Sequence, residues 1–431
     1  MNNQTSFSFE EAMTFIMSFS RFGKKVEDLS RIQRLLDLID NPQNDLDFIH
    51  IAGTNGKGST AEMLSEILCD AGIKTGIFTS PYIVEFRDRI RLMGKMISKT
   101  DLAQICNYIK SRLDGLADEQ DFSGFEITMA IALVYFKNVG CEVVVFETGL
   151  GGLLDCTNVI KNPLVSVITS ISHDHTEILG KTIREITEQK AGIIKDGCPV
   201  VLSVGNPDDA VDVVSNTAKE RGSRIIIPAP SMLEIKSTRL VDTSFVYKNI
   251  PYSLSMSGEH QIINALSAIE TACLLKDKFK ITEKNIQAGL SKAFVIGRTQ
   301  VLASDNHFVI LDGSHNDGGI EALSKVLSEI PKPITAIVGS LKIKDIRASL
   351  PKLFNIVEKI ICVDDFTSDT IPKNELCDIL NEEYSNYSKD KKTIAICGKD
   401  TKSEYKRAIT GEYQNTVICG TLYLVSYIKN L

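Results

Sequence analysis

The sequence predicts an α/β protein of two domains, each built around a mostly parallel β-sheet. Short apolar runs alternate with longer segments of helical periodicity, which is typical of βαβ units. The chain has 431 residues, more than one ordinary hydrophobic core holds, so two domains are expected. The strongest local pattern, a strand that runs into a glycine loop and then a helix, belongs to the same fold class.

The expected strands are short apolar runs separated by helical segments. Before residue 300 they cover 48–52, 142–146, 165–170, 199–204 and 224–227. After residue 300 they cover 308–311, 334–338, 359–363, 393–397 and 416–419. Residues 231–257 are richer in Thr, Ser, Val and Tyr and predict a small antiparallel excursion.

The domain boundary is expected beside Gly297. A helical stretch over 261–294 ends just before this glycine, and a new series of strands and helices follows it. The predicted domains are therefore 1–296 and 297–431. Ligands of open α/β sheets bind beyond the carboxyl ends of the strands, so a cleft between the domains is the expected site.

Composition limits the function classes. Hydrophobic residues make up 43% and charged residues 24%, as in a soluble globular protein. A net charge of -7 argues against bulk binding to nucleic acid or to a membrane surface. The longest apolar run, 129–136, is far too short to span a membrane. The start of the chain has a helix-capping pattern at Ser8 and Glu11 rather than a signal peptide.

Ten cysteines occur without a CxxC pair, and several lie inside apolar runs. This usage indicates small buried side chains in a reducing compartment, and neither a zinc site nor a disulfide framework. A cytoplasmic protein is expected.

The glycine loop of residues 53–58 predicts a phosphate site. An apolar strand precedes it, and a helix with Leu64, Ile67 and Leu68 on one face follows it. Loop N–H groups and the helix N-terminus then face an anion. Lys57 can reach β- and γ-phosphates, and Ser59 or Thr60 can reach Mg²⁺. Because Gly58 separates the lysine from the hydroxyl, the strict P-loop pattern is missed, but a nucleotide triphosphate is still expected.

Polar groups also follow two other expected strands of the first domain. Glu147 ends a buried run and precedes a glycine loop; the alternative is a carboxylate that only caps a turn. His173, Asp174 and His175 follow the next strand, a set that favours metal or phosphate binding over a structural histidine. Carboxylate, hydroxyl and imidazole together suit Mg²⁺ held partly by substrate phosphates.

Two further sets of residues could have either a functional or a plain structural role. Asp312 and His315 end a strand of the second domain, just after Arg298, which suits phosphate charge. The alternative there is an ordinary turn. Lys190 falls in an amphipathic helix, where on sequence alone a solvated lysine is the usual interpretation.

Together these motifs resemble the folylpolyglutamate synthase/dihydrofolate synthase family, a branch of the Mur ligase superfamily. The matching pieces, in the family's order, are 53–59, 79–82, 147–152 with 154–155 and 157–158, 174–176, 190–193, 260–261 with 264–265, 297–298, 312–313 with 315–316, and 420–425. They cover nearly the whole chain. The resemblance implies a P-loop-type Mur ligase central domain and a smaller Rossmann-like C-terminal domain.

The reaction that the resemblance implies is ATP-dependent amide formation between a folate carboxylate and L-glutamate. Transfer of the γ-phosphate gives an acyl phosphate, which the glutamate amine attacks. Dihydropteroate is a further acceptor, and nothing in the sequence separates the two activities. A monomer acting on small molecules is expected, with ATP and Mg²⁺ as cofactors; the need for a monovalent cation stays open.

The resemblance also assigns roles to residues. Lys57, Glu147, His175 and Lys190 would be catalytic. One Mg²⁺ would be held by Ser80 and Glu147 with Ser59 close by, and a second by His175, supported by Lys190 if that lysine is carbamylated. The residues that would contact ATP are Gly53, Thr54, Asn55, Gly56, Lys57, Gly58, Ser59, Thr60, Asn264, Arg298, Asp312 and His315.

Some positions depart from the family's pattern. Leu153 stands where Arg is usual, Thr299 where Phe is usual and Asp317 where Pro is usual, while Thr421 replaces a serine and keeps the hydroxyl. The first change removes a cation near the substrate cleft. Two alternatives therefore stay open: a Mur-like amide ligase with another carboxylate acceptor, and an ATP-binding regulatory protein without activity.

Overall fold

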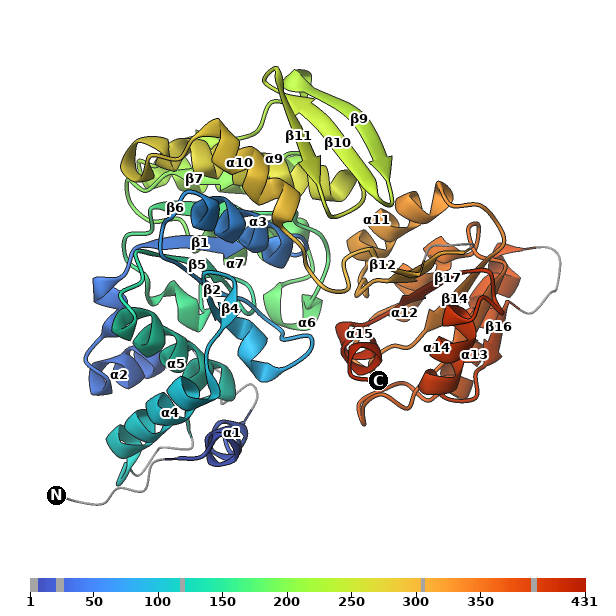
Figure 1. Cartoon of the computed structure of the whole chain (residues 1–431), viewed down its shortest axis with the longest axis horizontal. Coiled ribbons are helices and arrows are strands. Elements are labelled where there is room, and N and C mark those ends of the chain that lie inside the picture. Colours follow the sequence, from blue (N-terminus) through green and yellow to red (C-terminus); the bar gives the residue numbers. More distant parts are fainter. Residues whose placement is uncertain (1–6, 21–26, 117–120, 304–306, 389–393) are drawn as a thin grey trace. The chain divides into compact units, whose positions relative to one another are not determined.

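The computed structural model describes residues 7–20, 27–116, 121–303, 307–388 and 394–431. The chain divides into two compact units (Figure 1). The first comprises 1–171, 176–229 and 264–290, and the second comprises 172–175, 230–263 and 291–431. A large, mostly parallel sheet and a smaller C-terminal one confirm the expected α/β class.

The first unit is built on an eight-stranded sheet of order β4-β3-β2-β5-β1-β6-β7-β8. Its strands are β1 (Phe48–Ala52), β2 (Thr75–Phe78), β3 (Ile90–Leu92), β4 (Lys95–Met96), β5 (Val143–Glu147), β6 (Val165–Ile168), β7 (Val200–Leu202) and β8 (Ile225–Ile226). All neighbours pair in parallel except at β3 and β4. The central strands are buried throughout because helices cover both faces, as parallel sheets require.

Ten α-helices of the described residues precede the C-terminal sheet. They are α1 (Phe9–Met17), α2 (Ser30–Leu38), α3 (Lys57–Asp70), α4 (Lys99–Leu113), α5 (Gly124–Asn138), α6 (Thr176–Leu179), α7 (Ile183–Ala191), α8 (Asp208–Glu220), α9 (Glu259–Phe279) and α10 (Glu283–Lys292). The expected capping box at Ser8 and Glu11 begins α1. One core cluster includes side chains of α1, α2, α4 and α5 against β1, β2 and β5, and another joins α7 and α8 to β6 and β7.

The second unit contains a six-stranded sheet of order β12-β13-β17-β14-β15-β16, parallel except at β12. Its strands are β12 (Gln300–Ala303), β13 (Val309–Leu311), β14 (Ile334–Val338), β15 (Lys359–Cys362), β16 (Ala395–Cys397) and β17 (Asn415–Cys419). Its helices are α11 (Asp317–Ser328), α12 (Ile346–Ser349), α13 (Lys373–Tyr387), α14 (Thr401–Ile409) and α15 (Leu422–Lys429). The expected antiparallel excursion is a three-stranded sheet of β9 (Leu233–Arg239), β10 (Asp242–Tyr247) and β11 (Ile250–Leu254).

All ten expected strands are confirmed within the described residues, with ends that shift by one or two positions; Thr393 lies outside them. The sequence reasoning missed β2, β3, β4 and β12, which are short and mixed in composition. The helical stretch expected over 261–294 is confirmed as helical, with a break inside it. It is two helices, because Lys280 adopts a left-handed conformation (φ 57°) that ends α9.

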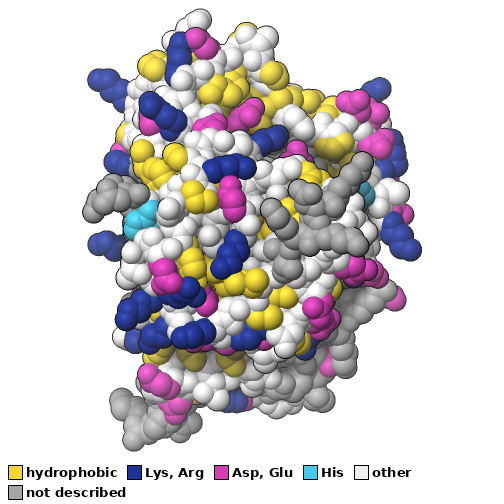
Figure 2. All heavy atoms as spheres, turned by 90° about the vertical axis from the view of Figure 1, so that its right-hand side faces the viewer, with side chains coloured by type: hydrophobic (Ala, Val, Ile, Leu, Met, Phe, Trp, Pro, Cys, Tyr) yellow, Lys and Arg dark blue, Asp and Glu magenta, His cyan; other side chains and the backbone are white. Residues whose placement is uncertain are grey.

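The described surface carries charges of both signs. Figure 2 shows Lys, Arg, Asp and Glu side chains over the face in view, with hydrophobic side chains between them. Among the described residues, none of the helices combines the length and apolar character needed to cross a bilayer.

Candidate active site

The loop between β1 and α3 has the geometry of a phosphate cradle. Gly56 precedes the first residue of α3 with a positive φ of 87°. A Cβ atom at this position would overlap the side-chain oxygen of Asn264, which comes from α9. Glycine is therefore needed both for the backbone turn and for the close approach of Asn264. The free N–H groups at the start of α3 suit an anion.

Lys57 and Glu147 lie side by side next to this loop. Lys57 Nζ is 3.3 Å from the carbonyl oxygen of Thr54 and 3.8 Å from Glu147 Oε1. Glu147 ends β5, the neighbour of β1, and is only 3% exposed. Its Oε2 accepts a hydrogen bond of 3.1 Å from the N–H of Ser80. The adjacency of two parallel strands thus brings a buried carboxylate to the lysine of the loop.

The first turn of α3 carries two hydroxyl side chains, and its backbone passes close to Glu147. Ser59 and Thr60 are buried, and Thr60 Oγ1 has no hydrogen-bond partner in the part of the chain that the structure describes. A Cβ atom at Gly58 would lie 3.7 Å from Glu147 Oε2. One carboxylate with nearby hydroxyls is a donor set that fits Mg²⁺. In the described ranges no group of three or more His, Cys, Asp or Glu side chains is placed to hold a metal ion by itself, so such a site would need other oxygen ligands.

Lys190 is buried, not solvated. Its side chain comes from the last turn of α7, is 3% exposed and donates a 2.8 Å hydrogen bond to the carbonyl oxygen of Gly53. The interpretation of a solvated lysine was wrong, because the periodicity of α7 did not reveal that this end of the helix packs beneath the glycine loop.

A second glycine loop, at 149–152, is fixed to the end of α7. A Cβ atom at Gly152 would lie 2.7 Å from the carbonyl oxygen of Gln189, and Leu153 N donates to that same oxygen at 2.6 Å. The buried carboxylate of Asp155 accepts from Leu150 N at 2.7 Å. Asn158 donates to the carbonyl oxygens of Leu153 and Gly192. These polar residues shape the loop that follows Glu147.

In the second unit, Asp312 directly follows β13, and three donors hold its carboxylate. Its Oδ2 accepts from the N–H of Thr299 at 2.7 Å and from the Thr299 hydroxyl at 3.2 Å. Its Oδ1 accepts from the N–H of Ser314 at 2.8 Å. Thr299 was noted only as a departure from the family pattern, yet it orients this carboxylate. Its signal in the sequence was its place directly after Gly297 and Arg298.

Two partly buried histidines lie near Asp312. Burial, and then Lys344, lower the pKa of His315 to about 4, while its Nδ1 contacts the carbonyl oxygen of Gly313 at 2.9 Å. Burial also lowers the pKa of His260 to about 4, against the opposing charge of Asp312 and in the same direction as Arg298. Both imidazoles are therefore neutral near pH 7. Neutral imidazoles can donate and accept hydrogen bonds at once.

The segment 172–175 belongs to the second unit. Asp174 accepts from Lys344 Nζ at 3.1 Å and from Asn316 Nδ2 at 2.9 Å. Burial opposes its ionisation, but Lys344 and His175 outweigh burial, so the pKa of Asp174 lies below its usual range. His175 has a positive φ of 51° and a side chain that is 39% exposed. The backbone there is oriented by its neighbour Asp174, whose Oδ1 accepts from His175 N.

The structure also places the three other residues that depart from the family pattern. Leu153 is 44% exposed, so its side chain fills no core. Asp317 is the first residue of α11 and forms an ion pair with Lys352 at 2.8 Å. Aspartate suits a first helical turn as proline does, although for a different reason, its favourable interaction with the helix dipole. Thr421 keeps the capping role of a hydroxyl, because its Oγ1 accepts from Tyr423 N at the start of α15.

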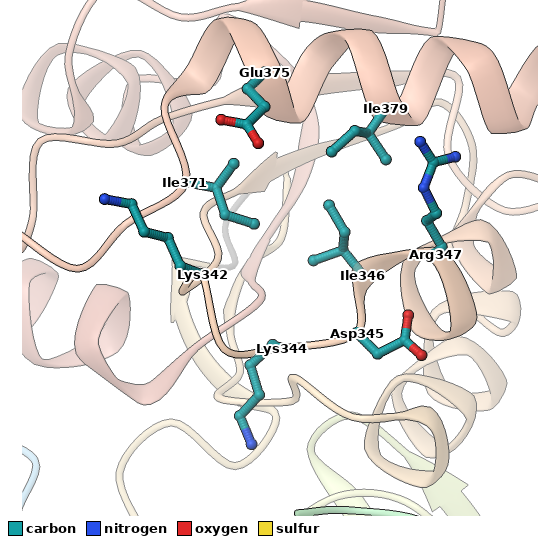
Figure 3. A pocket seen from close by; sticks show the side chains of 8 residues that line it. All are labelled: Lys342, Lys344, Asp345, Ile346, Arg347, Ile371, Glu375 and Ile379. Atoms are coloured by element: carbon teal, nitrogen blue, oxygen red, sulfur yellow. The ribbon is translucent and has the colours of Figure 1, made fainter. Parts of the chain in front are cut away.

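A hollow of the second unit lies beside α12 and α13 (Figure 3). Ile346, Ile371 and Ile379 face one another at its centre, and the Lys344 side chain points away from them. The Arg347 guanidinium forms ion pairs with Glu382 and Glu383. None of the sequence-predicted site residues lines this hollow.

The predicted site residues thus form two groups. The first unit brings Lys57, Glu147, Ser80 and Ser59 to the first glycine loop, with Asn264 and Lys190 packed against it. The second unit holds Arg298, Asp312 and His315 near one another, and the Asp174–His175 segment belongs to it.

Comparison with known proteins identifies the matching families. The Mur ligase middle domain matches residues 51–272, and the dihydrofolate synthetase C-terminal domain matches residues 296–431. A dihydrofolate synthase/folylpolyglutamate synthase of Bacillus subtilis is 33% identical, with 98% of each chain covered.

Solved structures agree. The folylpolyglutamate synthase of Thermotoga maritima has a TM-score of 0.81 and 31% identity, with 98% of this chain and 96% of that chain covered. A folylpolyglutamate synthase complex with AMPPCP has a TM-score of 0.81 and 28% identity, with coverage of 98% and 99%.

Fold, glycine loop and matches define a Mur-type ligase, the class of ATP-dependent enzymes that form amide bonds. Within that class, the chain belongs to the dihydrofolate synthase/folylpolyglutamate synthase family. The resemblance noted in the sequence is therefore confirmed.

Proposed function

We propose that this enzyme uses ATP to join L-glutamate to the carboxylate of a folate, and that dihydropteroate is a further acceptor. The observation that carries the proposal is the pairing of Lys57 with the buried Glu147 beside the glycine loop. It is supported by the B. subtilis relative, whose name covers both activities, and by the AMPPCP complex of a folylpolyglutamate synthase. A cytoplasmic monomer is part of the proposal.

In this proposal the first unit supplies the glycine loop that binds the phosphates. Residues 53–60 wrap the triphosphate with N–H groups, and Lys57 holds the β- and γ-phosphates. Glu147, Ser80 and Ser59 would hold one Mg²⁺, and His175 and a carbamylated Lys190 a second. When bound, Mg²⁺ neutralises charge on the transferring phosphoryl group. The side chain of Asn264 packs against Gly56 and supports the loop from that side.

Amide formation needs an activated carboxylate, because a free carboxylate is a poor acyl donor. Phosphoryl transfer from ATP to the pterin carboxylate gives an acyl phosphate. The amine of glutamate attacks its carbonyl carbon, and phosphate leaves from the tetrahedral intermediate. We place Arg298, Asp312 and His315 at ATP, with the latter two also near the incoming glutamate. The three donors that hold Asp312 keep its carboxylate oriented.

We also propose the domain limits 1–296 and 297–431. The proposed boundary falls in the segment between α10, which ends at Lys292, and β12, which begins at Gln300.

The test is glutamate-dependent phosphate release from Mg-ATP with dihydropteroate, with tetrahydrofolate and without an acceptor. Release with either pterin supports the proposal, and the pattern tells whether one or both steps are catalysed. Protein that binds ATP but releases no phosphate with any acceptor would instead be a regulatory homologue.

A second candidate is amide ligation to another carboxylate acceptor. The observation that favours it is Leu153, an exposed apolar side chain where the family usually has arginine. Phosphate release with an acidic peptide or another pterin-free carboxylate, and with neither pterin, would decide for this candidate.

A further inference from the structure

Three cysteine side chains gather between α13 and the edge of the C-terminal sheet. Cys362 of β15 and Cys397 of β16 are register partners on adjacent parallel strands, so their side chains leave the same face of the sheet. Cys377 comes from α13, which packs on these strands (Figure 1). The Sγ atoms of Cys377 and Cys397 are 3.4 Å apart.

The three thiols differ in access to solvent. Cys397 lies on the edge strand β16 and is exposed, whereas Cys377 is 5% exposed and Cys362 is fully buried. A small reagent can therefore reach one sulfur, and a sheltered sulfur lies directly behind it. None of the three belongs to the proposed ligase site.

We propose that Cys377 and Cys397 form a reversible intramolecular disulfide on reaction with a low-molecular-weight disulfide. An S–S bond is about 2.05 Å long, and closing 3.4 Å to that length requires a small rotation about the side-chain bonds. Disulfides of proteins in reducing compartments are transient, so the bond would be a modification and not part of the fold.

The reaction balances as two exchange steps. First, the Cys397 thiol loses its proton, and its sulfur attacks the reagent; a mixed disulfide forms and one small thiol is released. The sulfur of Cys377 then attacks the Cys397 sulfur, and the second small thiol leaves. Two protein thiols are oxidised, and the reagent's disulfide is reduced to two thiols that carry both protons.

The surroundings of Cys377 suit the second step. The thiols of Cys362 and then Cys397 donate to its sulfur and lower the pKa of Cys377 to about 7. A thiolate is the attacking species in exchange. The buried Cys377 needs no contact with solvent, because the sulfur it attacks is its neighbour. Burial and the contact with Cys377 raise the pKa of Cys397, so a rise in pH favours the first step, in which Cys397 attacks the reagent as a thiolate.

The experiment treats the full chain with oxidised glutathione and maps its peptides by mass spectrometry. We expect a link between the peptides of Cys377 and Cys397, a loss of two hydrogen atoms and full reversal by dithiothreitol. Cys377→Ser should stop at glutathione bound to Cys397, and Cys397→Ser should abolish both products. Cys198→Ser, in the first unit, is the matched control and should keep the link.

Three results would overturn the proposal: no reaction, a lasting glutathione adduct on Cys397 in the unsubstituted chain, or a link between Cys362 and Cys377. Peptide mapping of the unsubstituted chain is enough to support or overturn the proposal, without any variant. Circular dichroism of each variant shows whether a missing link reflects an altered fold, and Cys377→Ala and Cys397→Ala replace a serine variant that does not fold.

Discussion

Lys190 donates a hydrogen bond of 2.8 Å to the carbonyl oxygen of Gly53, the first residue of the phosphate loop. The two residues are 137 positions apart in the sequence. The contact fixes the end of α7 to the end of β1. Carbamylation of Lys190 would put an acceptor oxygen at the end of this side chain, so it would exchange this contact for others.

Lys190→Ala should lower kcat by about a hundredfold, the usual cost of losing one group that stabilises charge at a reacting centre. If the lysine acts as a carbamate, formate or acetate should restore part of the activity of the alanine variant. The assay is phosphate release with and without the added carboxylate, beside a thermal melt. Full activity without rescue would remove Lys190 from the catalytic group, and Lys190→Arg serves as the control that keeps the charge.

Glu147→Ala should abolish turnover while the fold is retained. Glu147 lies at the carboxyl end of β5, where its oxygens accept from Ser80 N and face Lys57, and it is not part of the apolar core. We expect a loss of at least about a hundredfold in kcat, measured as phosphate release. Activity within about twofold of the wild type would refute the metal assignment. Glu147→Gln keeps the shape and separates loss of charge from loss of volume.

Most of the fold was predictable because the strands of parallel sheets have a clear pattern in the sequence. Central strands such as 48–52 and 334–338 are buried on both faces, so they are continuous apolar runs. The strands β3 and β4, at one end of the sheet, were not predictable, because they are partly exposed and composed of mixed residues. The break at Lys280 left no signal, since a lysine rarely adopts a positive φ.

For the site, the position of a residue at a strand end could be read from the sequence. The contacts between residues far apart in the sequence could not. Glu147 and Asp312 were found because each follows a buried strand. The approach of Asn264 to Gly56 and the burial of Lys190 depend on contacts between segments far apart in the sequence. Only the family resemblance pointed to them. The two hydrogen bonds from Thr299 to Asp312 became visible only in the structure.

Leu153→Arg should lower the KM for a folate acceptor by about two- to fivefold, the range expected for one solvent-exposed charge. The Leu153 side chain is 44% exposed, and its hydrogen bond to Gln189 uses only the backbone, so arginine fits without repacking. Steady-state kinetics with varied acceptor measure the effect. Leu153→Gln controls for polarity; an unchanged KM in the arginine variant would show that no acceptor charge lies near this position.

His50→Gln should reduce the acid sensitivity of folding. His50 lies in β1, its Nε2 is 2.9 Å from the Thr157 hydroxyl, and burial, with help from Lys195, lowers its pKa to about 3. In the unfolded chain the pKa is about 6.5. As the pH falls below about 6.5, His50 therefore binds a proton in the unfolded state but not in the folded state. The free energy of unfolding decreases progressively toward pH 3. Between about pH 7.5 and pH 5.5 this loss amounts to about 1.4 kcal/mol.

The glutamine variant lacks the pH-dependent loss of stability that His50 causes, while the other histidines contribute equally to both proteins. The free energy of unfolding of His50→Gln relative to the wild type should therefore improve by about 1.4 kcal/mol between about pH 7.5 and pH 5.5. Urea unfolding followed by circular dichroism at both pH values measures it. If the difference in free energy of unfolding between the two proteins did not change with pH, His50 would bind its proton equally well in the folded and unfolded states. That result would conflict with the burial of His50 in β1 beside Thr157.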